Sequence, residues 1–177
     1  MLCHLNIGSN IGDSRAIIGR AIMLIERDIA CSGTLRASHP AVTEPWGFRS
    51  DNRFINVGAE MLTDLSPELL MERIKAIETE LGATPHRNPD GSYRDRNIDI
   101  DIIHLGDMVV DTPGLTVPHP RMHEREFVLR PLAELSPQWR HPLLQLTAPA
   151  LLESLPPQSE SWDDRQNQSP NNEQETV

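Results

Sequence analysis

Four short segments of the chain have the apolar or alternating pattern of β-strands. The first is the apolar run from Leu2 to Ile7, which ends at a Gly-Ser-Asn turn, and the second is the extended stretch from Leu35 to Val42. The third is FINVGAEML, residues 54–62, and the fourth lies within RDRNIDIDIIHLG, residues 94–106. These segments predict the strands of one sheet.

Two segments between these strands have the apolar spacing of amphipathic helices. The first begins at an N-cap, Asp13 or Ser14, and its apolar positions are Ile17, Ile18, Ala21, Ile22, Leu24 and Ile25. The second begins at Ser66-Pro67-Glu68, a cap followed by proline at the first helical position, and ends at Gly82. Its positions predicted to face inward are Leu69, Leu70, Ile74, Ile77 and Leu81.

The remaining segments extend this core pattern. Asp107 begins a turn into an apolar stretch at 108–110, residues 113–120 are expected to be irregular, and RMHEREFVLRPLAEL, residues 121–135, predicts a short helix interrupted by Pro131. The order β-α-β-β-α-β is that of the split βαβ arrangement, so we predict an α+β, ferredoxin-like sandwich with helices packed on an antiparallel sheet. One domain is expected over residues 1–155, followed by a polar, disordered tail over 156–177.

Composition and charge restrict the function. The 177 residues are 38% hydrophobic and 4% aromatic, with a formal net charge of −10. This charge argues against non-specific binding to nucleic acids or anionic membranes, and with so few aromatics it also argues against an RNA-binding sheet. An anionic small ligand remains compatible, because local arginines or bound cations can reverse the field in one cleft.

Cysteine usage and the N-terminus indicate the compartment. Cys3 and Cys31 have no metal-ligand spacing and both lie in apolar segments, so buried free thiols in a reducing compartment are expected. The N-terminal residues lack the pattern of a signal peptide, and no segment is apolar for long enough to span a bilayer. We expect a cytoplasmic protein and a monomer.

The isoleucine–aspartate alternation predicts a site. In an extended strand Ile98, Ile100 and Ile102 share one face, and Asp99 and Asp101 share the other, about 6–7 Å apart. A solvated strand face is the ordinary interpretation of such a pair. However, aspartate is depleted in strands and the two charges repel, so a hard divalent cation with oxygen ligands, Mg²⁺ rather than Zn²⁺, accounts for them better.

Cationic side chains flank this strand, and a proline-braced segment downstream adds more. Considered alone, each of these side chains would be interpreted as a solvated surface charge. The residues concerned are Arg87, Arg94, Arg96, His119, Arg121, His123, Arg125 and Arg130. Carboxylates that hold metal ions, together with arginines that neutralise a transferred group, are the equipment of phosphoryl transfer.

Five motifs in order resemble the 6-hydroxymethyl-7,8-dihydropterin pyrophosphokinase family of folate biosynthesis. They are IGSNIGD (7–13), TEPWGF…RFIN (43–56), IKAIETELG (74–82), RNIDIDII (96–103) and LTVPHPRMHEREFVLRPLAEL (115–135). The resemblance covers nearly all of the chain except its tail. It implies transfer of the β,γ-diphosphate of ATP to the hydroxymethyl group of the dihydropterin, with release of AMP. It also implies that Asp99 and Asp101 hold two Mg²⁺ ions.

The same resemblance assigns a pterin site. It implies that Phe54 and Phe127 stack on the two faces of the pterin ring and that Asn56 contacts its polar edge, as an amide with both donor and acceptor can. The alternative for the two phenylalanines is a core position. The backbone from Thr43 to Trp46 completes the implied site, so the pterin-binding residues are Thr43, Pro45, Trp46, Phe54, Asn56 and Phe127.

The resemblance further assigns the nucleotide site and the catalytic groups. The implied ATP-binding residues are Glu78, Arg96, Ile102, Thr116, His119 and Arg125. The implied catalytic residues are Asp99, Asp101, Arg96, His119 and Arg125. Glu78 has an alternative interpretation, in which it is only a solvent-facing helix residue.

The chain departs from the family after the second helix. Ala83 stands where a basic residue is common, and Arg87 or Arg94 is a candidate for the missing charge. The main alternative function is a non-catalytic domain of ferredoxin-like fold that binds a small ligand or regulates. That alternative explains the topology but leaves the aspartate pair and the cations without a role.

Overall fold

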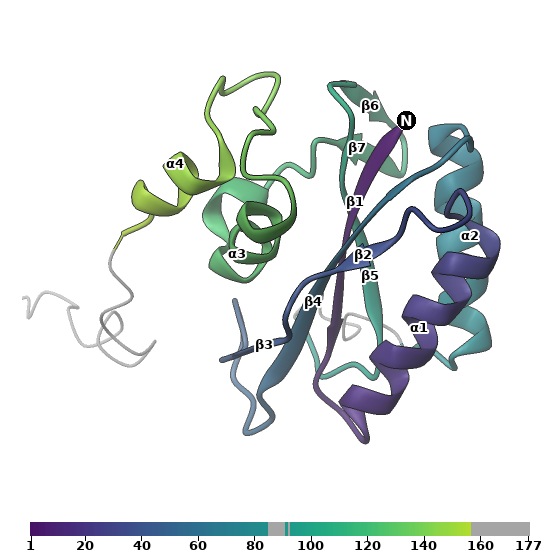
Figure 1. Cartoon of the computed structure of the whole chain (residues 1–177). Coiled ribbons are helices and arrows are strands. Elements are labelled where there is room, and N and C mark those ends of the chain that lie inside the picture. Colours follow the sequence, from purple (N-terminus) through teal and green to yellow (C-terminus); the bar gives the residue numbers. More distant parts are fainter. Residues whose placement is uncertain (85–90, 92, 157–177) are drawn as a thin grey trace, which may run out of the picture.

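A computed structural model describes residues 1–84, 91 and 93–156 of the chain, and the structural statements below concern those residues. The predicted order β-α-β-β-α-β is present (Figure 1). The elements are β1 (Leu2–Ser9), α1 (Ser14–Asp28), β2 (Arg36–Ala37), β3 (Ala41–Thr43), β4 (Phe54–Leu62), α2 (Pro67–Glu80), β5 (Asp99–Leu105), β6 (Val110–Thr112), β7 (Leu115–Val117), the 3-10 turn η1 (Met122–Glu124), α3 (Glu126–Leu135) and α4 (Ala148–Glu153).

The main sheet is antiparallel and has β1 near its centre. β1 pairs with β4 on one side and with β5 on the other, and β2 and β3 both pair with the outer side of β4. With β2 and β3 counted as one interrupted strand, this order is that of the ferredoxin-like sandwich. The predicted fold class is therefore confirmed.

The expectation of one strand from Leu35 to Val42 was wrong, because this stretch divides into β2 and β3. At the break the Ser38 hydroxyl accepts a hydrogen bond from the Gly58 amide, and the Ser38 amide donates to the Gly58 carbonyl. Pro40 follows, and it has no amide hydrogen with which to continue the ladder. A side chain thus replaces one strand-to-strand bond, and pairing resumes at Ala41.

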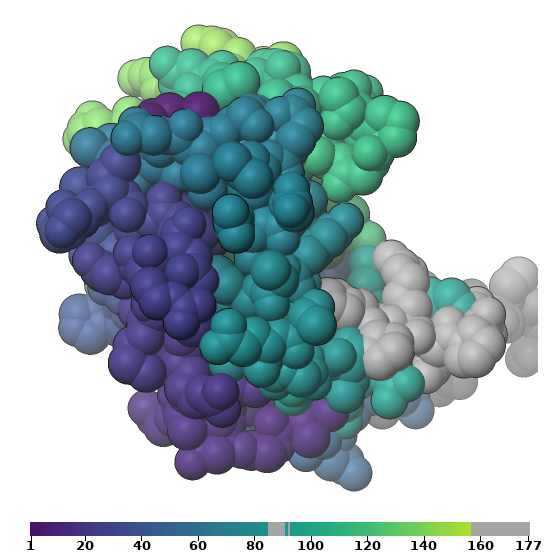
Figure 2. Space-filling model, turned by 90° about the vertical axis from the view of Figure 1, so that its right-hand side faces the viewer, coloured from purple at the N-terminus to yellow at the C-terminus, as the bar shows by residue number. Residues whose placement is uncertain are grey.

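Helices α1 and α2 cover one face of the sheet, and their outer surfaces form the side of the molecule seen in Figure 2. Both start where the sequence predicted, since the Asp13 carboxylate accepts from the Ala16 amide and the Ser66 hydroxyl from the Leu69 amide. One expectation was wrong: Leu69, in the first turn of α2, is exposed, while Leu70 packs into the core.

A second layer covers part of the opposite face of the sheet and consists of η1, α3 and α4 (Figure 1). Pro131 does not interrupt the helix, as was expected, but lies buried inside α3. It packs against the sheet at Gly58, where a side chain would approach the Pro131 Cβ to 2.6 Å. The six-residue helix α4, which the sequence did not predict, completes this layer.

A β-hairpin lies beside β5. It consists of β6 and β7, so the expectation that residues 113–120 are irregular was wrong for 115–117. Gly114 makes the turn between its strands with a φ of +98°. Among the described helices, none combines the length and the apolar character that crossing a bilayer requires. The expected tail falls almost wholly at 157–177, outside the described residues.

Candidate active site

The aspartate pair lies where the alternation predicted. Ile98, Ile100 and Ile102 are buried in the core below α1 and α2. Asp99 and Asp101 point to the opposite face of β5, where their strand neighbours on β1 are Gly8 and Asn6. Their side chains are 12% and 31% exposed, so Asp101 is the more accessible of the two carboxylates.

Each aspartate has an arginine partner. Arg96 Nε lies 2.8 Å from Asp99 Oδ2, and Arg125 Nη1 lies 3.8 Å from Asp101 Oδ2. Burial and the neighbouring charge of Asp99 nevertheless raise the pKa of Asp101 to about 7, although Arg125 and Arg96 lower it. The two arginines therefore offset only part of the combined effect of burial and of the Asp99 charge on the pKa of Asp101.

His119 is fixed as a neutral ring beside this pair. Its amide donates to the Ile103 carbonyl at 2.9 Å, which ties the segment before η1 to β5. The Arg121 amide donates to the ring Nδ1 at 3.2 Å, and Arg125 Nη1, which can only donate, lies 3.5 Å from Nε2, so both ring nitrogens face donors. Burial and the charge of Arg125 lower the pKa of His119 to about 4.

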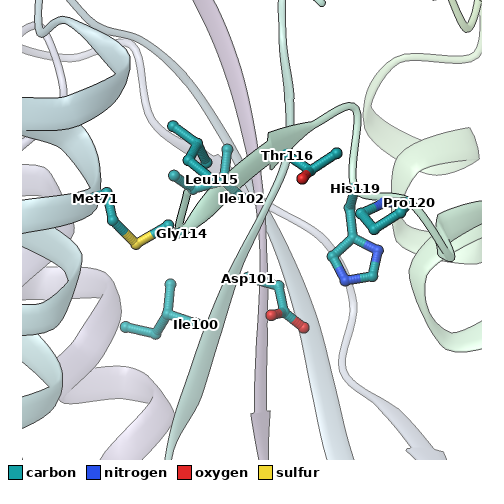
Figure 3. Close-up of a pocket in the computed structure, with 9 residues that line it drawn as sticks. All are labelled: Met71, Ile100, Asp101, Ile102, Gly114, Leu115, Thr116, His119 and Pro120. Atoms are coloured by element: carbon teal, nitrogen blue, oxygen red, sulfur yellow. The ribbon is translucent and has the colours of Figure 1, made fainter. Parts of the chain in front are cut away.

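A pocket of about 300 Å³ opens between β5, α2 and β7. Figure 3 shows the Asp101 carboxylate and the His119 ring facing the same space, while Met71 and Ile100 lie on the side toward α2. The lining residues are Met71, Ile100, Asp101, Ile102, Gly114, Leu115, Thr116, His119 and Pro120. Three of the residues expected to bind nucleotide, Ile102, Thr116 and His119, thus line one pocket with Asp101.

Arginines lie over the faces of the aromatic rings expected at the pterin site. The guanidinium carbon of Arg96 lies 5.0 Å from the Phe54 ring centroid. That of Arg125 lies 4.8 Å from the Trp46 centroid and 5.7 Å from the Phe127 centroid. Phe54 is buried and Phe127 half-buried, so each ring is fixed by packing on one side.

Asn56 and Thr43 form a polar group next to Phe54. Asn56 is buried on β4, and its amide nitrogen donates to the Thr43 hydroxyl at 2.9 Å. Gly8 keeps the neighbouring position on β1 small, because a side chain there would approach Asn56 Oδ1 to 3.0 Å. Pro45 lies half-buried in the loop after Thr43.

Glu78 contacts the strand that carries the aspartates. Its Oε1 accepts a hydrogen bond from the Ile100 amide at 2.9 Å, on the edge of β5 that does not pair with β1. The interpretation of Glu78 as only a solvent-facing helix residue was therefore wrong. The basic residue expected to compensate for Ala83 is still not assigned, because Arg87 lies outside the described residues and Arg94 is exposed.

Sequence reasoning missed Asn10, which joins the two loops of the site. Its Oδ1 accepts from the Arg96 amide at 2.9 Å, and its Nδ2 donates to Asp95 Oδ1 at 2.7 Å and to the Asn52 carbonyl at 3.3 Å. Asp95 Oδ2 in turn accepts from the Asn52 side chain at 2.7 Å. The only signal was the polar ending of the first strand, Gly-Ser-Asn.

Paired carboxylates, arginines and an open pocket on a split βαβ sheet are the equipment of a transferase that acts on a phosphorylated nucleotide. Residues 4–137 match the profile of the 7,8-dihydro-6-hydroxymethylpterin-pyrophosphokinase (HPPK) family. The chain belongs to this family. It is an ATP-dependent pyrophosphokinase of folate biosynthesis.

Relatives and solved structures support this membership. The chain is similar to 2-amino-4-hydroxy-6-hydroxymethyldihydropteridine pyrophosphokinases from Porphyromonas gingivalis, with 38% identity over 80% of this chain and 94% of the relative, and from Bacillus subtilis, with 36% identity over 77% and 79%. Its fold resembles that of the Plasmodium falciparum HPPK-DHPS crystal structure, with a TM-score of 0.66 at 14% identity, over 86% of this chain and 43% of that one.

Proposed function

We propose that Asp99 and Asp101 hold two Mg²⁺ ions and that Arg96, His119 and Arg125 act with them in transferring the β,γ-diphosphate of ATP to 6-hydroxymethyl-7,8-dihydropterin. The observation that carries the proposal is the position of both carboxylates on one face of β5, with Asp101 lining the pocket shared by Thr116 and His119. The donor set fits the metal, because carboxylate oxygens suit Mg²⁺ and the two carboxylates lie on one face of β5. When bound, Mg²⁺ would neutralise charge on the phosphate oxygens.

The nucleotide would occupy the pocket between β5 and β7. Ile102 would pack against its base and the Thr116 hydroxyl would bond to a polar edge, in place of its present bond to Asp111 at 3.2 Å. His119 lines this pocket and would contact a phosphate oxygen through a ring N–H, and Arg96 and Arg125 would neutralise charge on the phosphate chain. Glu78 would act on ATP through the Ile100 amide, by holding β5 in place.

The pterin would lie between Phe54 and Phe127, with its polar edge against Asn56 and Thr43 and the backbone around Pro45 and Trp46. The guanidinium groups now over these aromatic faces support this, since a flat, electron-poor ligand takes the same positions. Arg96 would leave the face of Phe54 as the pterin binds and move to the phosphates.

The transfer itself balances without a further reactant. The pterin hydroxyl oxygen bonds to the β-phosphorus of ATP, and the bond from that phosphorus to the oxygen bridging toward the α-phosphate breaks. AMP leaves with the bridging oxygen, and the hydroxyl proton passes to solvent. Catalysis would depend chiefly on positioning and on charge neutralisation by the arginines, as is usual for a loose phosphoryl-transfer transition state.

Product analysis of matched variants tests the proposal. With ATP, Mg²⁺ and the dihydropterin, the wild type should release AMP, while Asp99→Asn and Asp101→Asn should each lower kcat by about 100-fold or more. Asp107→Asn, at an exposed aspartate just after β5, should leave kcat unchanged. Release of ADP or free pyrophosphate, or an active Asp99→Asn/Asp101→Asn double variant, would contradict the proposal.

We further propose that the folded unit covers residues 1–155 and acts as a monomer in the cytoplasm. The end of the last described helix at Glu153 supports the bounds of the unit, and the two free thiols, Cys3 buried and Cys31 half-buried rather than buried as expected, support the compartment. Light scattering on the purified chain tests the monomer, and a dimer mass at micromolar concentration would contradict it.

A further inference from the structure

A second cluster of ligating side chains lies on the same sheet face as the aspartates, toward the other end of β1. His4 on β1 is the direct strand neighbour of Glu60 on β4 and of His104 on β5. A register shift in the β1–β5 pairing, between His4 and Leu5, aligns His104 with His4. The sheet thus brings three side chains from three strands into one row.

The row is buried and its imidazoles are not hydrogen-bonded. His4 and His104 have 0% exposure and Glu60 has 2%. None of the four ring nitrogens of the two histidines has a hydrogen-bond partner in the described part of the chain. A neutral imidazole has one donor and one acceptor, and buried groups of this kind are rarely left unsatisfied, so the geometry points to a ligand between them.

The three side chains are held in place by their surroundings. The Glu60 carboxylate is bonded by the Arg36 guanidinium and by the Ser136 hydroxyl at the end of α3. The His104 ring stacks on Trp139 at 4.2 Å between centroids and 9° between planes. Trp139 is itself fixed, because its Nε1 donates to the Gly106 carbonyl at 2.9 Å. Packing and second-row bonds of this kind orient metal ligands in proteins.

We propose that His4, Glu60 and His104 bind one divalent transition-metal ion of the zinc class, which joins three strands of the sheet beneath α3. Two imidazole nitrogens and one carboxylate oxygen suit zinc rather than Mg²⁺, which prefers oxygen ligands only. One ligand atom from each residue lies within 4.8 Å of the other two. Ligands of a tetrahedral zinc site lie about 3.4 Å apart, so small side-chain movements close the site.

This site does not depend on the proposed function. His104 follows Asp101 by three positions on β5, and the ligands of the two sites differ in chemistry as well as in place. Histidine binds metal as a neutral imidazole, and the two rings are buried side by side on neighbouring strands. The role of the ion would be structural, because the ligands lie buried under α3.

Metal binding by the full-length chain tests the proposal with readouts other than activity. The protein is stripped with a chelator, kept in excess Mg²⁺ to fill the aspartate site, and titrated with Zn²⁺ and with Co²⁺. The wild type should retain one equivalent of Zn²⁺, show the intense visible absorption of tetrahedral Co²⁺ and unfold at a higher temperature with Zn²⁺ than without it.

Two substitutions remove the ligands but keep a ring. His104→Phe and His4→Phe should bind Co²⁺ at least about 10-fold more weakly and lose the thermal response to Zn²⁺. His39→Gln, at a histidine whose side chain is 94% exposed, should behave as wild type. The comparison of wild type with and without Zn²⁺ needs no variant, so a misfolded variant leaves the test intact. Binding of no more than trace Zn²⁺ by the wild type, or equal binding by His104→Phe, would overturn the proposal.

Discussion

The Glu78 carboxylate on α2 accepts a hydrogen bond from the Ile100 amide on β5, at 2.9 Å. Ile100 lies between the two aspartates of the site and is the register partner of Ile7 on β1, but its amide points to the other edge of β5, toward Glu78. A helix side chain therefore takes the place that a further strand would fill, and it fixes the part of the edge strand that carries Asp99 and Asp101. We therefore expect Glu78 to act on the nucleotide through the position of β5 rather than through direct contact.

Substitutions at Glu78 separate these two roles. Glu78→Ala removes the acceptor and should lower the free energy of unfolding by about 1 kcal/mol while raising the KM for ATP. Glu78→Gln keeps the acceptor oxygen and should stay close to wild type in both. Glu72→Ala, at an exposed glutamate of the same helix, is the control. Denaturant unfolding and steady-state kinetics measure the two effects. A Glu78→Gln enzyme with wild-type stability but a much higher KM would indicate direct contact with ATP instead.

Asn10 should couple the two loops of the site. Asn10→Ala removes its bonds to Asp95, to the Arg96 amide and to the Asn52 carbonyl, so Arg96 loses its fixed position. We expect kcat to fall about 10-fold, with only a small loss in thermal stability. Steady-state kinetics and thermal unfolding of the variant measure the two.

A charge exchange provides the control for this prediction. Asn10→Asp places a carboxylate against that of Asp95 and should be as harmful as Asn10→Ala. The double variant Asn10→Asp/Asp95→Asn restores a donor opposite an acceptor and should recover part of kcat. If the double variant is no better than the sum of the single ones, the two side chains do not act as a pair.

The sequence predicted those features that depend on neighbours along the chain. The caps at Asp13 and Ser66 act on amides three residues away, and the faces of Asp99 and Asp101 follow from alternation alone. The resemblance to the family then named Thr116 and His119, and the structure places both in one pocket, while their roles stay predictions.

Features that depend on strand register were not predictable in this way. His4, Glu60 and His104 lie more than 40 positions apart from one to the next along the chain. They are aligned only by the pairing of β1 with β4 and with β5, and by the register shift between His4 and Leu5 in the second pairing. Pro131 reads as a helix breaker locally, yet its packing on Gly58 stabilises the helix that contains it. Helix α4 has six residues, too few for a periodic pattern.

The buried thiol of Cys3 should make stability fall at high pH. Burial raises the pKa of Cys3 from 9.0 to about 12. Between these values the unfolded thiol ionises and the folded one does not, so the folded chain binds more protons and the free energy of unfolding decreases as pH rises. Cys3→Ala removes the group. Its free energy of unfolding, measured with denaturant at about pH 8, below this window, and at about pH 10.5, inside it, should change less between the two than that of wild type. Equal differences for both proteins would show that the thiol does not contribute.

Substitution by alanine at Gly58 and at Gly19 should change the free energy of unfolding in opposite directions. At Gly58 a new Cβ would lie 2.6 Å from the Pro131 Cβ and 3.0 Å from His4 Nε2, and both neighbours are fixed in packed elements. Gly58→Ala should push α3 from the sheet and lower the free energy of unfolding by about 1–3 kcal/mol. At Gly19, inside α1, a Cβ meets nothing within 4 Å, so Gly19→Ala should raise it by about 0.5–1 kcal/mol through helix propensity. Urea unfolding of both variants measures the difference. If Gly58→Ala is as stable as wild type, α3 does not press on the sheet at this point, and its close packing over the buried histidines is not what holds that layer in place.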